Sequence, residues 1–270
     1  MKNRFFVVII LLFTQRGSAQ VISETPFSIG ETIEMYSNTL SENRTLNIYL
    51  PESYQSDKAK RYPVIYLLDG SKDEDFIHVA GLVQFCSFSW IDIIDESIVV
   101  GIGNVDRKRD FTYPSNLEID KKEFPTSGGS DRFMNFIEKE VQTIIANKYR
   151  VIDQKTIIGQ SLGGLLATEI LFKRPDLFDN YIIVSPSLWW DDEALLNYEP
   201  DKIFKDKSVY IGVGKEGPVM ERVAKSLFDK LIVEMPDDAK IHFGFFETQS
   251  HGDALHLAVY DAFEKIFNQD

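Results

Sequence analysis

A strand, a sharp turn and a helix are predicted in direct succession by the stretch TIIGQSLGGLLATE, residues 156–169. An apolar run precedes the turn and a run of helix formers follows it. At the turn, Gly159, Ser161 and Gly163 match the pattern G-x-S-x-G, in which glycines on either side of the serine relieve a crowded backbone and leave its hydroxyl clear at the carboxyl end of the strand. An ordinary strand-to-helix loop is the alternative reading. Because the flanking runs supply the context that the motif requires, Ser161 is the candidate nucleophile.

The rest of the chain alternates between strand-like and helix-like patterns. Residues 32–37 and 44–50 alternate apolar with polar side chains and predict an antiparallel pair. Nearly continuous apolar runs at 62–68 and 97–102 are typical of parallel strands buried on both faces. Further strands are expected at 181–184, 208–213 and 240–247, and helices at 76–85, 132–147, 220–235 and 253–268. This order predicts a mostly parallel sheet with N-terminal antiparallel strands and helices on both faces. A long polar and aromatic segment, 105–130, interrupts the pattern and is expected to be functional or mobile.

The N-terminus has the pattern of a secretory signal. Lys2 and Arg4 precede the apolar block 5–13, and small residues follow at 17–19. The block is too short for a bilayer span, which needs about 20 residues. We therefore expect a cleaved signal peptide over residues 1–19, a single domain over 20–270 and a periplasmic or secreted product; an uncleaved anchor is the alternative.

Composition excludes several classes of partner. The chain has 29 basic and 42 acidic residues, a net charge of −13, which argues against nucleic acid and against stable association with an anionic membrane. Cys86 is the only cysteine, so an exported product has no internal disulfide; its neighbours Phe85 and Phe88 suggest a buried, inert thiol. There is no H-E-x-x-H motif, clustered Cys/His set or nucleotide-binding glycine motif, so neither metal nor cofactor is expected. Oligomeric state is not indicated.

The base is identified by elimination among four histidines. His242 lies within a predicted strand, and His78 and His256 lie in helix-like segments, so these three are interpreted as structural. His251 instead lies in the loop after the last strand. Because the carboxyl ends of parallel strands share one edge of a sheet, where ligands bind, His251 can meet Ser161 there.

The acid that orients the base is expected between serine and histidine in chain order, on a loop at the same edge. Glu216 fits best because it follows the strand 208–213. Asp191, Asp192 and Glu193, after the preceding strand, are the alternatives. Any of these carboxylates could instead be a solvated loop charge.

Serine attack generates an oxyanion, which two backbone N–H groups should bind. One donor is expected at Leu162, directly after the nucleophile. The other is expected at Ser71, which follows Asp69-Gly70 at the end of an earlier strand.

Four large side chains are candidates for substrate contacts at this edge. Trp189 and Trp190 follow a strand end, and two adjacent tryptophans in a loop cannot easily both point into the core, so at least one should face the cleft. Arg107 and Arg109 can offer a positive group to an anionic substrate. An ion pair with Asp106 or Asp110 is the alternative for the arginines, and a place in the core is the alternative for each tryptophan.

Together these motifs resemble the esterase-D-like branch of the α/β-hydrolases, which includes enterobactin-type siderophore esterases, feruloyl esterases and mycolyltransferases. The resemblance rests on the segments YLLDG (66–70), GIGN (101–104), RKRDFT (107–112), GQSLGG (159–164), SPSLWW (185–190), Gly214 with Glu216, and SHG (250–252). It implies an α/β-hydrolase fold with Ser161 and His251 as nucleophile and base, Glu216 as acid, and Ser71 and Leu162 as oxyanion donors. Some siderophore esterases of this branch work with a Ser-His pair alone.

The expected function is hydrolysis of a bulky carboxylic ester, such as a siderophore or feruloyl ester, through an acyl-enzyme on serine. Acyl transfer to an alcohol at the same site is one alternative. A non-catalytic ligand-binding protein on a hydrolase fold is another, although serine, histidine and a plausible acid are all present. The sequence does not identify the substrate.

Overall fold

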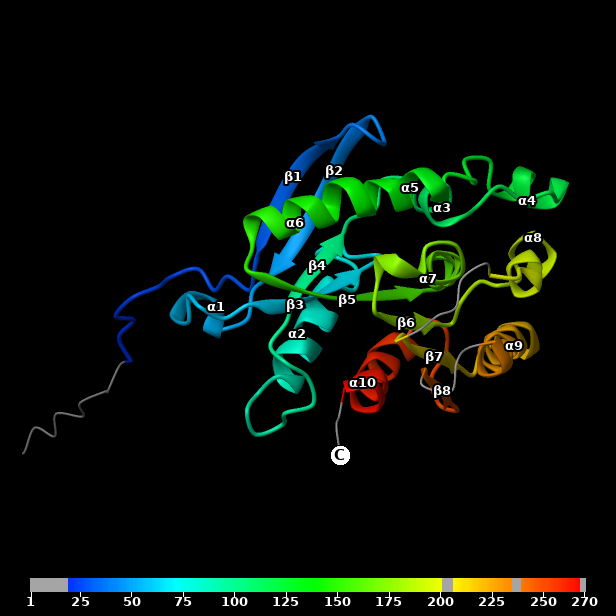
Figure 1. Cartoon of the computed structure of the whole chain (residues 1–270). Helices are drawn as coiled ribbons and strands as arrows, with labels where there is room; N and C mark the ends of the chain where they lie inside the picture. The colour runs from blue at the N-terminus through cyan, green and yellow to red at the C-terminus, as the bar shows by residue number, and fades with distance from the viewer. Residues whose placement is uncertain (1–18, 201–205, 235–238, 268–270) are drawn as a thin grey trace, which may run out of the picture.

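The computed structural model describes residues 19–200, 206–234 and 239–267, which form one eight-stranded sheet covered by helices (Figure 1). The sheet order is β1-β2-β4-β3-β5-β6-β7-β8. The strands are β1 Glu31–Ser37, β2 Glu42–Tyr49, β3 Tyr62–Leu67, β4 Ile98–Ile102, β5 Val151–Gln160, β6 Asn180–Val184, β7 Ser208–Gly214 and β8 Lys240–Phe246. The predicted signal segment lies, apart from its last residue, outside the described residues. No helix among those described is long and apolar enough to cross a membrane.

The strand directions confirm the predicted sheet. β1 pairs antiparallel with β2 and β2 antiparallel with β4, whereas every pairing from β4 to β8 is parallel. In the parallel part, Gln160 of β5 lies opposite Val184 of β6, and Val184 lies opposite Gly212 of β7. The carboxyl ends of these strands therefore share one edge of the sheet.

Two helical layers cover the sheet (Figure 1). On one face lie α2 (Phe76–Cys86) and α10 (Ala254–Phe267); on the other lie α5 (Ser130–Phe136), α6 (Gln142–Lys148), α7 (Leu162–Lys173) and α9 (Pro218–Glu234). Successive strand residues point to opposite faces, so Ile157 packs in the core under α7 while Ile158 packs in the core under α2 and α10. This explains the nearly continuous apolar runs of the parallel strands.

The helical segments differ in detail from the prediction. The helix expected at 132–147 contains a π-helical turn, Ile137–Val141, between α5 and α6. The 105–130 segment contains two short helices, α3 (Arg107–Phe111) and α4 (Glu118–Glu123). Asp106 caps α3 by accepting the Arg109 N–H at 3.0 Å. Helices of one or two turns carry too little periodicity to stand out in a sequence. Other short turns are α1 (Ser53–Ser56), α8 (Trp190–Glu193) and two 3₁₀ turns, Pro175–Leu177 and Ala194–Asn197.

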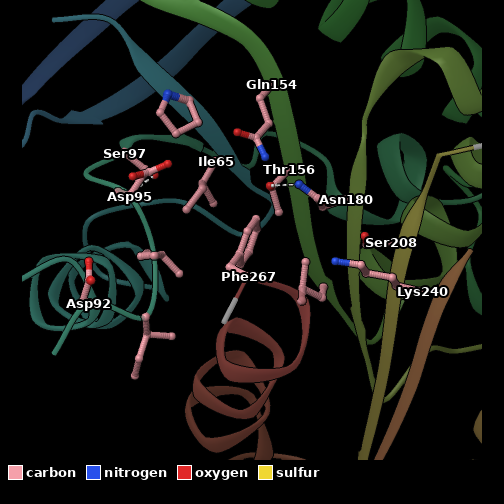
Figure 2. A pocket seen from close by; sticks show the side chains of 14 residues that line it. Ile65, Asp92, Asp95, Ser97, Gln154, Thr156, Asn180, Ser208, Lys240 and Phe267 are labelled. Carbon is pink, nitrogen blue, oxygen red and sulfur yellow. Dashed lines mark hydrogen bonds between the residues drawn. The ribbon is translucent and has the colours of Figure 1, made fainter. Parts of the chain in front are cut away.

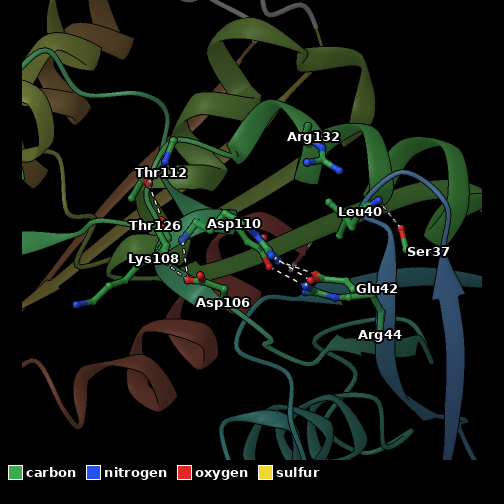
Figure 3. Close-up of polar contacts among 12 residues, drawn as sticks. Ser37, Leu40, Glu42, Arg44, Asp106, Lys108, Asp110, Thr112, Thr126 and Arg132 are labelled. Atoms are coloured by element: carbon green, nitrogen blue, oxygen red, sulfur yellow. Dashed lines mark hydrogen bonds and ion pairs between the residues drawn. The ribbon is translucent and has the colours of Figure 1, made fainter. Parts of the chain in front are cut away.

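A buried charge cluster ties the N-terminal hairpin to α3 (Figure 3). The fully buried Arg44 of β2 donates to Asp110 Oδ2 at 2.7 Å and to Glu42 Oε1 at 2.9 Å. It also donates to the Gly103 carbonyl at 3.1 Å. A buried ion pair adds little net stability, but leaving one partner unpaired is costly. The cluster therefore fixes where α3, and with it Arg107, sits against the sheet.

The residues interpreted as structural lie on regular elements. The exposed His78 of α2 and the partly buried His256 of α10 contact each other, with ring centroids 4.4 Å apart and planes inclined by 31°. His242 lies in β8. Cys86 is fully buried, and burial raises the pKa of its thiol to about 11, which matches an inert thiol.

Candidate active site

Ser161 occupies a strained turn between β5 and α7. Its φ and ψ are 59° and −120°, a conformation that side chains rarely adopt. The turn is held by hydrogen bonds: the Ser161 N–H donates to Val184 O at 3.0 Å, and the Ser161 carbonyl accepts from Leu165 N at 2.9 Å and from Ser187 N at 3.0 Å. The helix thus begins directly at the residue after the serine.

Gly159 is the glycine that this turn requires most strictly. A Cβ at Gly159 would lie 2.3 Å from the Gly163 carbonyl oxygen, a contact that no side chain can make. A Cβ at Gly163 would meet its nearest neighbours, Asp69 Oδ2 and Leu68 Cβ, at 3.4 Å. The first glycine of the motif therefore permits the close return of the chain, while the second lies against the loop after β3.

His251 and Glu216 form a close pair at the same sheet edge. Glu216 follows β7, His251 follows β8, and His251 Nδ1 lies 2.5 Å from Glu216 Oε2. The Glu216 side chain is 2% exposed, whereas that of His251 is 47% exposed. A buried carboxylate on Nδ1 fixes the tautomer and leaves Nε2 as the acceptor.

Hydrogen bonds keep the Glu216 carboxylate ionised. Burial alone would raise the pKa of this carboxyl, but hydrogen bonds from His251, Ser185 and the Gly214 N–H outweigh burial and lower the pKa below its ordinary value. Ser185 Oγ donates to Oε1 at 2.5 Å and Gly214 N donates to the same oxygen at 2.9 Å. The carboxylate that contacts His251 is thus itself held by two further donors.

Gln160, the neighbour of Ser161, connects the serine to the histidine loop. Its Nε2 donates to the His251 carbonyl at 2.6 Å. Within the described part of the chain, Ser161 Oγ is hydrogen-bonded to Ser187 Oγ, at 3.3 Å, and not to His251. Serine-to-base hydrogen bonds are often long in free enzymes and tighten when substrate binds.

The two predicted oxyanion donors lie at the ends of β3 and β5. Leu162 is the first residue of α7, so its N–H has no partner within the helix. The Ser71 N–H donates to Glu74 Oε2 at 3.3 Å. An oxyanion bound to both donors would displace the Glu74 carboxylate from Ser71.

Arg107 links the loop after β3 to the end of β5. Its Nε lies 2.6 Å from Asp69 Oδ1 and its Nη2 lies 2.8 Å from Asp69 Oδ2, a bidentate pair. The same Nη2 donates to the Gln160 carbonyl at 3.2 Å. Asn104 Nδ2 also donates to Asp69 Oδ1, at 2.7 Å. Asp69, with φ of 55°, stands two residues before Ser71. The structure therefore gives Arg107 a partner other than Asp106 or Asp110.

Arg109 joins the buried charge cluster. It donates to Asp110 Oδ1 at 2.8 Å and to Glu42 at 2.6 and 3.0 Å. The ion-pair alternative describes these contacts, because each of the three guanidinium nitrogens donates to a carboxylate of the fold.

The two tryptophans differ. Trp190 is fully buried, and its indole N–H donates to the Tyr113 carbonyl at 2.9 Å. Trp189 is half-buried beside Phe124, with ring centroids 6.1 Å apart. Trp189 is thus the member of the pair that retains an accessible face.

The residues considered as alternatives to Glu216 do not contact His251 and have other surroundings. Asp191 accepts from the Asn116 N–H at 2.6 Å and from Asn116 Nδ2 at 3.1 Å. Asp192 is exposed, and Glu193 pairs with Arg222 at 2.6 Å. Among the candidates, Glu216 is the one against His251.

Several residues at the site carry no role in the sequence prediction: Gln160, Ser185, Ser187, Asp69 and Asn104. Ser185 and Ser187 follow β6 at the same edge as Ser161, so their place beyond a strand end is a usable signal. The Gln160 and Asp69 contacts depend on side-chain directions that spacing does not specify.

The strand order, with a strained serine after β5 and a carboxylate-histidine pair after β7 and β8, defines an α/β-hydrolase. The "Putative esterase" family model matches residues 37–244. The chain is 28% identical over 268 residues to the ferri-bacillibactin esterase BesA of Bacillus subtilis, covering 90% of this chain and 92% of that protein.

Solved structures give the same result. An IroE-like serine hydrolase from Shewanella oneidensis superposes with a TM-score of 0.79 and 28% identity, covering 89% of this chain and 82% of that one. The BES protein from Bacillus cereus gives 0.78 and 27%, covering 92% and 99%. The chain belongs to this esterase family, in its siderophore esterase branch, as the motifs indicate.

Replacing Glu216 by glutamine should lower kcat by more than about tenfold, because the neutral amide neither fixes the imidazole tautomer nor stabilises its charged form. Asp192→Asn is the matched control and should change kcat much less. Since the pKa of Glu216 is below its ordinary value of 4.5, the carboxylate is ionised throughout about pH 6 to 9, so titration of Glu216 itself should not change the wild-type kcat over this range. The measurement is p-nitrophenyl butyrate hydrolysis; a larger effect of Asp192→Asn would move the acid to the loop after β6.

Replacing Arg107 by lysine should lower kcat about 10- to 100-fold with little change in KM, because a lysine cannot hold Asp69 and Gln160 together and small displacements of catalytic groups are costly. Arg222→Lys removes a bidentate pair of the same type with Glu193, which is exposed, and should change kcat less than about twofold. An increase in KM with unchanged kcat would instead mean that Arg107 binds substrate.

Proposed function

We propose that the chain is a serine carboxylic-ester hydrolase that works through an acyl-enzyme. Ser161 attacks the ester carbonyl, His251 takes the serine proton and gives it to the leaving alcohol, and Glu216 orients the imidazole. Leu162 and Ser71 N–H groups hold the oxyanion. Water, deprotonated by His251, then releases the acid. The observation that carries the proposal is the 2.5 Å contact of His251 Nδ1 with Glu216, on a loop that Gln160 holds beside the strained serine.

A bulky ester is the proposed substrate. Trp189 is half-buried beside Phe124, and Lys108 Nζ lies 4.6 Å from the centroid of the Phe124 ring. These side chains offer flat apolar surface and a cation on the strand edge that carries Ser161, which suits a large aromatic acyl group. The name of the Bacillus subtilis relative, a ferri-bacillibactin esterase, supports including siderophore esters in the proposed class.

Acyl transfer remains a second outcome for the same acyl-enzyme, because only the identity of the acceptor differs. Adding a small alcohol during hydrolysis separates the two: a hydrolase forms mainly the free acid, and a transferase forms mainly the new ester. A non-catalytic binding role is disfavoured because nucleophile, base and acid are all present at the site.

Ser161→Ala and His251→Ala should each remove nearly all esterase activity, to below a few per cent of the wild-type rate, because members of a catalytic unit fail together. The double variant should be no slower than either single variant. The measurement is p-nitrophenyl butyrate hydrolysis, with far-UV circular dichroism and thermal unfolding to show that the variants are folded.

Covalent labelling gives an independent measure. A fluorophosphonate should modify the wild-type protein once, at Ser161, and peptide mass spectrometry locates the adduct. Labelling elsewhere, or substantial activity of Ser161→Ala, contradicts the assignment of the nucleophile.

Trp189→Ala should reduce kcat/KM for methyl ferulate at least about tenfold more than for p-nitrophenyl acetate, because only the larger acyl group contacts the indole face. Trp90→Ala is the matched control: Trp90 is 75% exposed and lies in the loop after α2, so both substrates should be unaffected. Equal losses on the two substrates for Trp189→Ala would assign Trp189 to the fold and not to substrate recognition.

A further inference from the structure

A row of polar side chains crosses the sheet at the edge opposite to Ser161. Thr156 of β5 lies opposite Asn180 of β6, Asn180 opposite Ser208 of β7, and Ser208 opposite Lys240 of β8. Because these four residues are in register, their side chains point to the same face of the sheet. All four line a cavity of about 530 Å³, called here the amino-edge cavity. This volume lies within the range of about 300–1,000 Å³ that small-molecule sites occupy.

The other wall of the amino-edge cavity comes from the loop before β4 and from the end of α10. Asp92, Asp95 and Ser97 lie on the loop, and Phe267 is the last described residue of α10. Figure 2 shows the Phe267 ring between the Asp92 and Asp95 side and the Asn180 and Lys240 side. The cavity thus has a flat apolar ring between two polar walls.

The floor of this cavity is not an ordinary solvated strand end. Thr156 is 3% exposed and Asn180 is 5% exposed, and the Asn180 amide donates to Thr156 Oγ1 at 3.1 Å. Two residues further along each strand, on the same face of the sheet, Ile158 and Ile182 are apolar and covered by α2 and α10. Buried polar groups on a helix-covered sheet face are costly unless they have partners. The polar row appears where the helical cover opens into the cavity.

The charged groups of the cavity are also available. Within the described ranges, no ion pair is formed by Asp92, Asp95 or Lys240. Two carboxylates facing one ammonium disfavour a phosphate or another strongly anionic ligand. Carboxylate, amide and hydroxyl groups on two walls can instead accept from and donate to the hydroxyl groups of an uncharged ligand.

We infer that the amino-edge cavity is a carbohydrate-binding site, separate from the esterase site. Neighbouring strands lie about 4.8 Å apart, so the row from Thr156 to Lys240 spans about 14 Å and is long enough to hold a disaccharide. The Phe267 ring stacks against the apolar face of a sugar ring, while the more exposed members of the row, Ser208 and Lys240, and Asp95 bind its hydroxyl groups. The site lies at the amino ends of the strands, so a bound sugar leaves Ser161 accessible.

The test uses the full chain and a panel of disaccharides: cellobiose, maltose, xylobiose and N,N′-diacetylchitobiose. Saturation-transfer NMR detects binding, and isothermal titration calorimetry measures Kd. At least one disaccharide should bind with Kd of about 1 mM or tighter. Phe267→Ala and Asp95→Ala should each weaken that binding at least about tenfold and leave p-nitrophenyl butyrate hydrolysis unchanged. Ser161→Ala should bind the sugar as the wild type does.

Glu264→Ala is the control on α10, because Glu264 is exposed and does not line the cavity; it should leave binding unchanged. Thermal unfolding of each variant shows whether the fold is retained, and Lys240→Ala replaces any variant that does not fold. The inference is overturned if no disaccharide of the panel binds at about 10 mM. It is equally overturned if bound sugar is insensitive to the cavity substitutions, or if Ser161→Ala removes the binding.

Discussion

The backbone conformation of Ser161 determines several features of the candidate active site at once. With φ of 59° and ψ of −120°, the chain turns from β5 into α7 at a single residue. That turn places the Ser161 hydroxyl beside Ser187 and starts a helix whose first residue, Leu162, has no intrahelical partner for its N–H. It also brings the backbone of Gly163 so close to residue 159 that residue 159 has no room for a side chain. The proposed nucleophile, one proposed oxyanion donor and the glycine pattern are thus consequences of one strained conformation.

Gln160 joins the two halves of the site. On the base side, its side-chain amide donates to the His251 carbonyl, and His251 in turn bonds to the buried Glu216. On the oxyanion side, its main-chain carbonyl accepts from Arg107, which holds Asp69 in a bidentate pair. The two carboxylates of this hydrogen-bond network, Glu216 and Asp69, each bond to more than one partner. This is the condition for a buried polar network to rigidify its surroundings. The positions of the His251 loop and of the loop after β3 therefore both depend on Gln160, the residue next to Ser161.

The sequence predicts those features that follow from strand ends and fails where side-chain direction decides. Glu216 and His251 follow different strands, yet parallel pairing brings both to one edge, so their contact follows from topology. The sequence also predicts Trp190 and Arg109 at this edge, because both follow strand ends. The Trp190 indole instead fills the core, and the Arg109 guanidinium joins a buried charge cluster. The polar row of the amino-edge cavity escapes sequence reasoning for a related reason: its members are far apart in the chain and meet only through sheet register.

The conformation of Ser161 also links activity to the stability of the whole domain. A non-glycine residue held in such a region costs about 1–3 kcal/mol, which the hydrogen bonds and packing of the β5–α7 unit must offset. Glycine adopts this conformation freely and loses only about 0.5–1 kcal/mol in chain entropy. A chain with glycine at position 161 would therefore lack the nucleophile and yet be as stable as the natural one, or more so. Selection for folding alone would favour the glycine, so a serine in this conformation is what the proposed nucleophilic role of its hydroxyl requires.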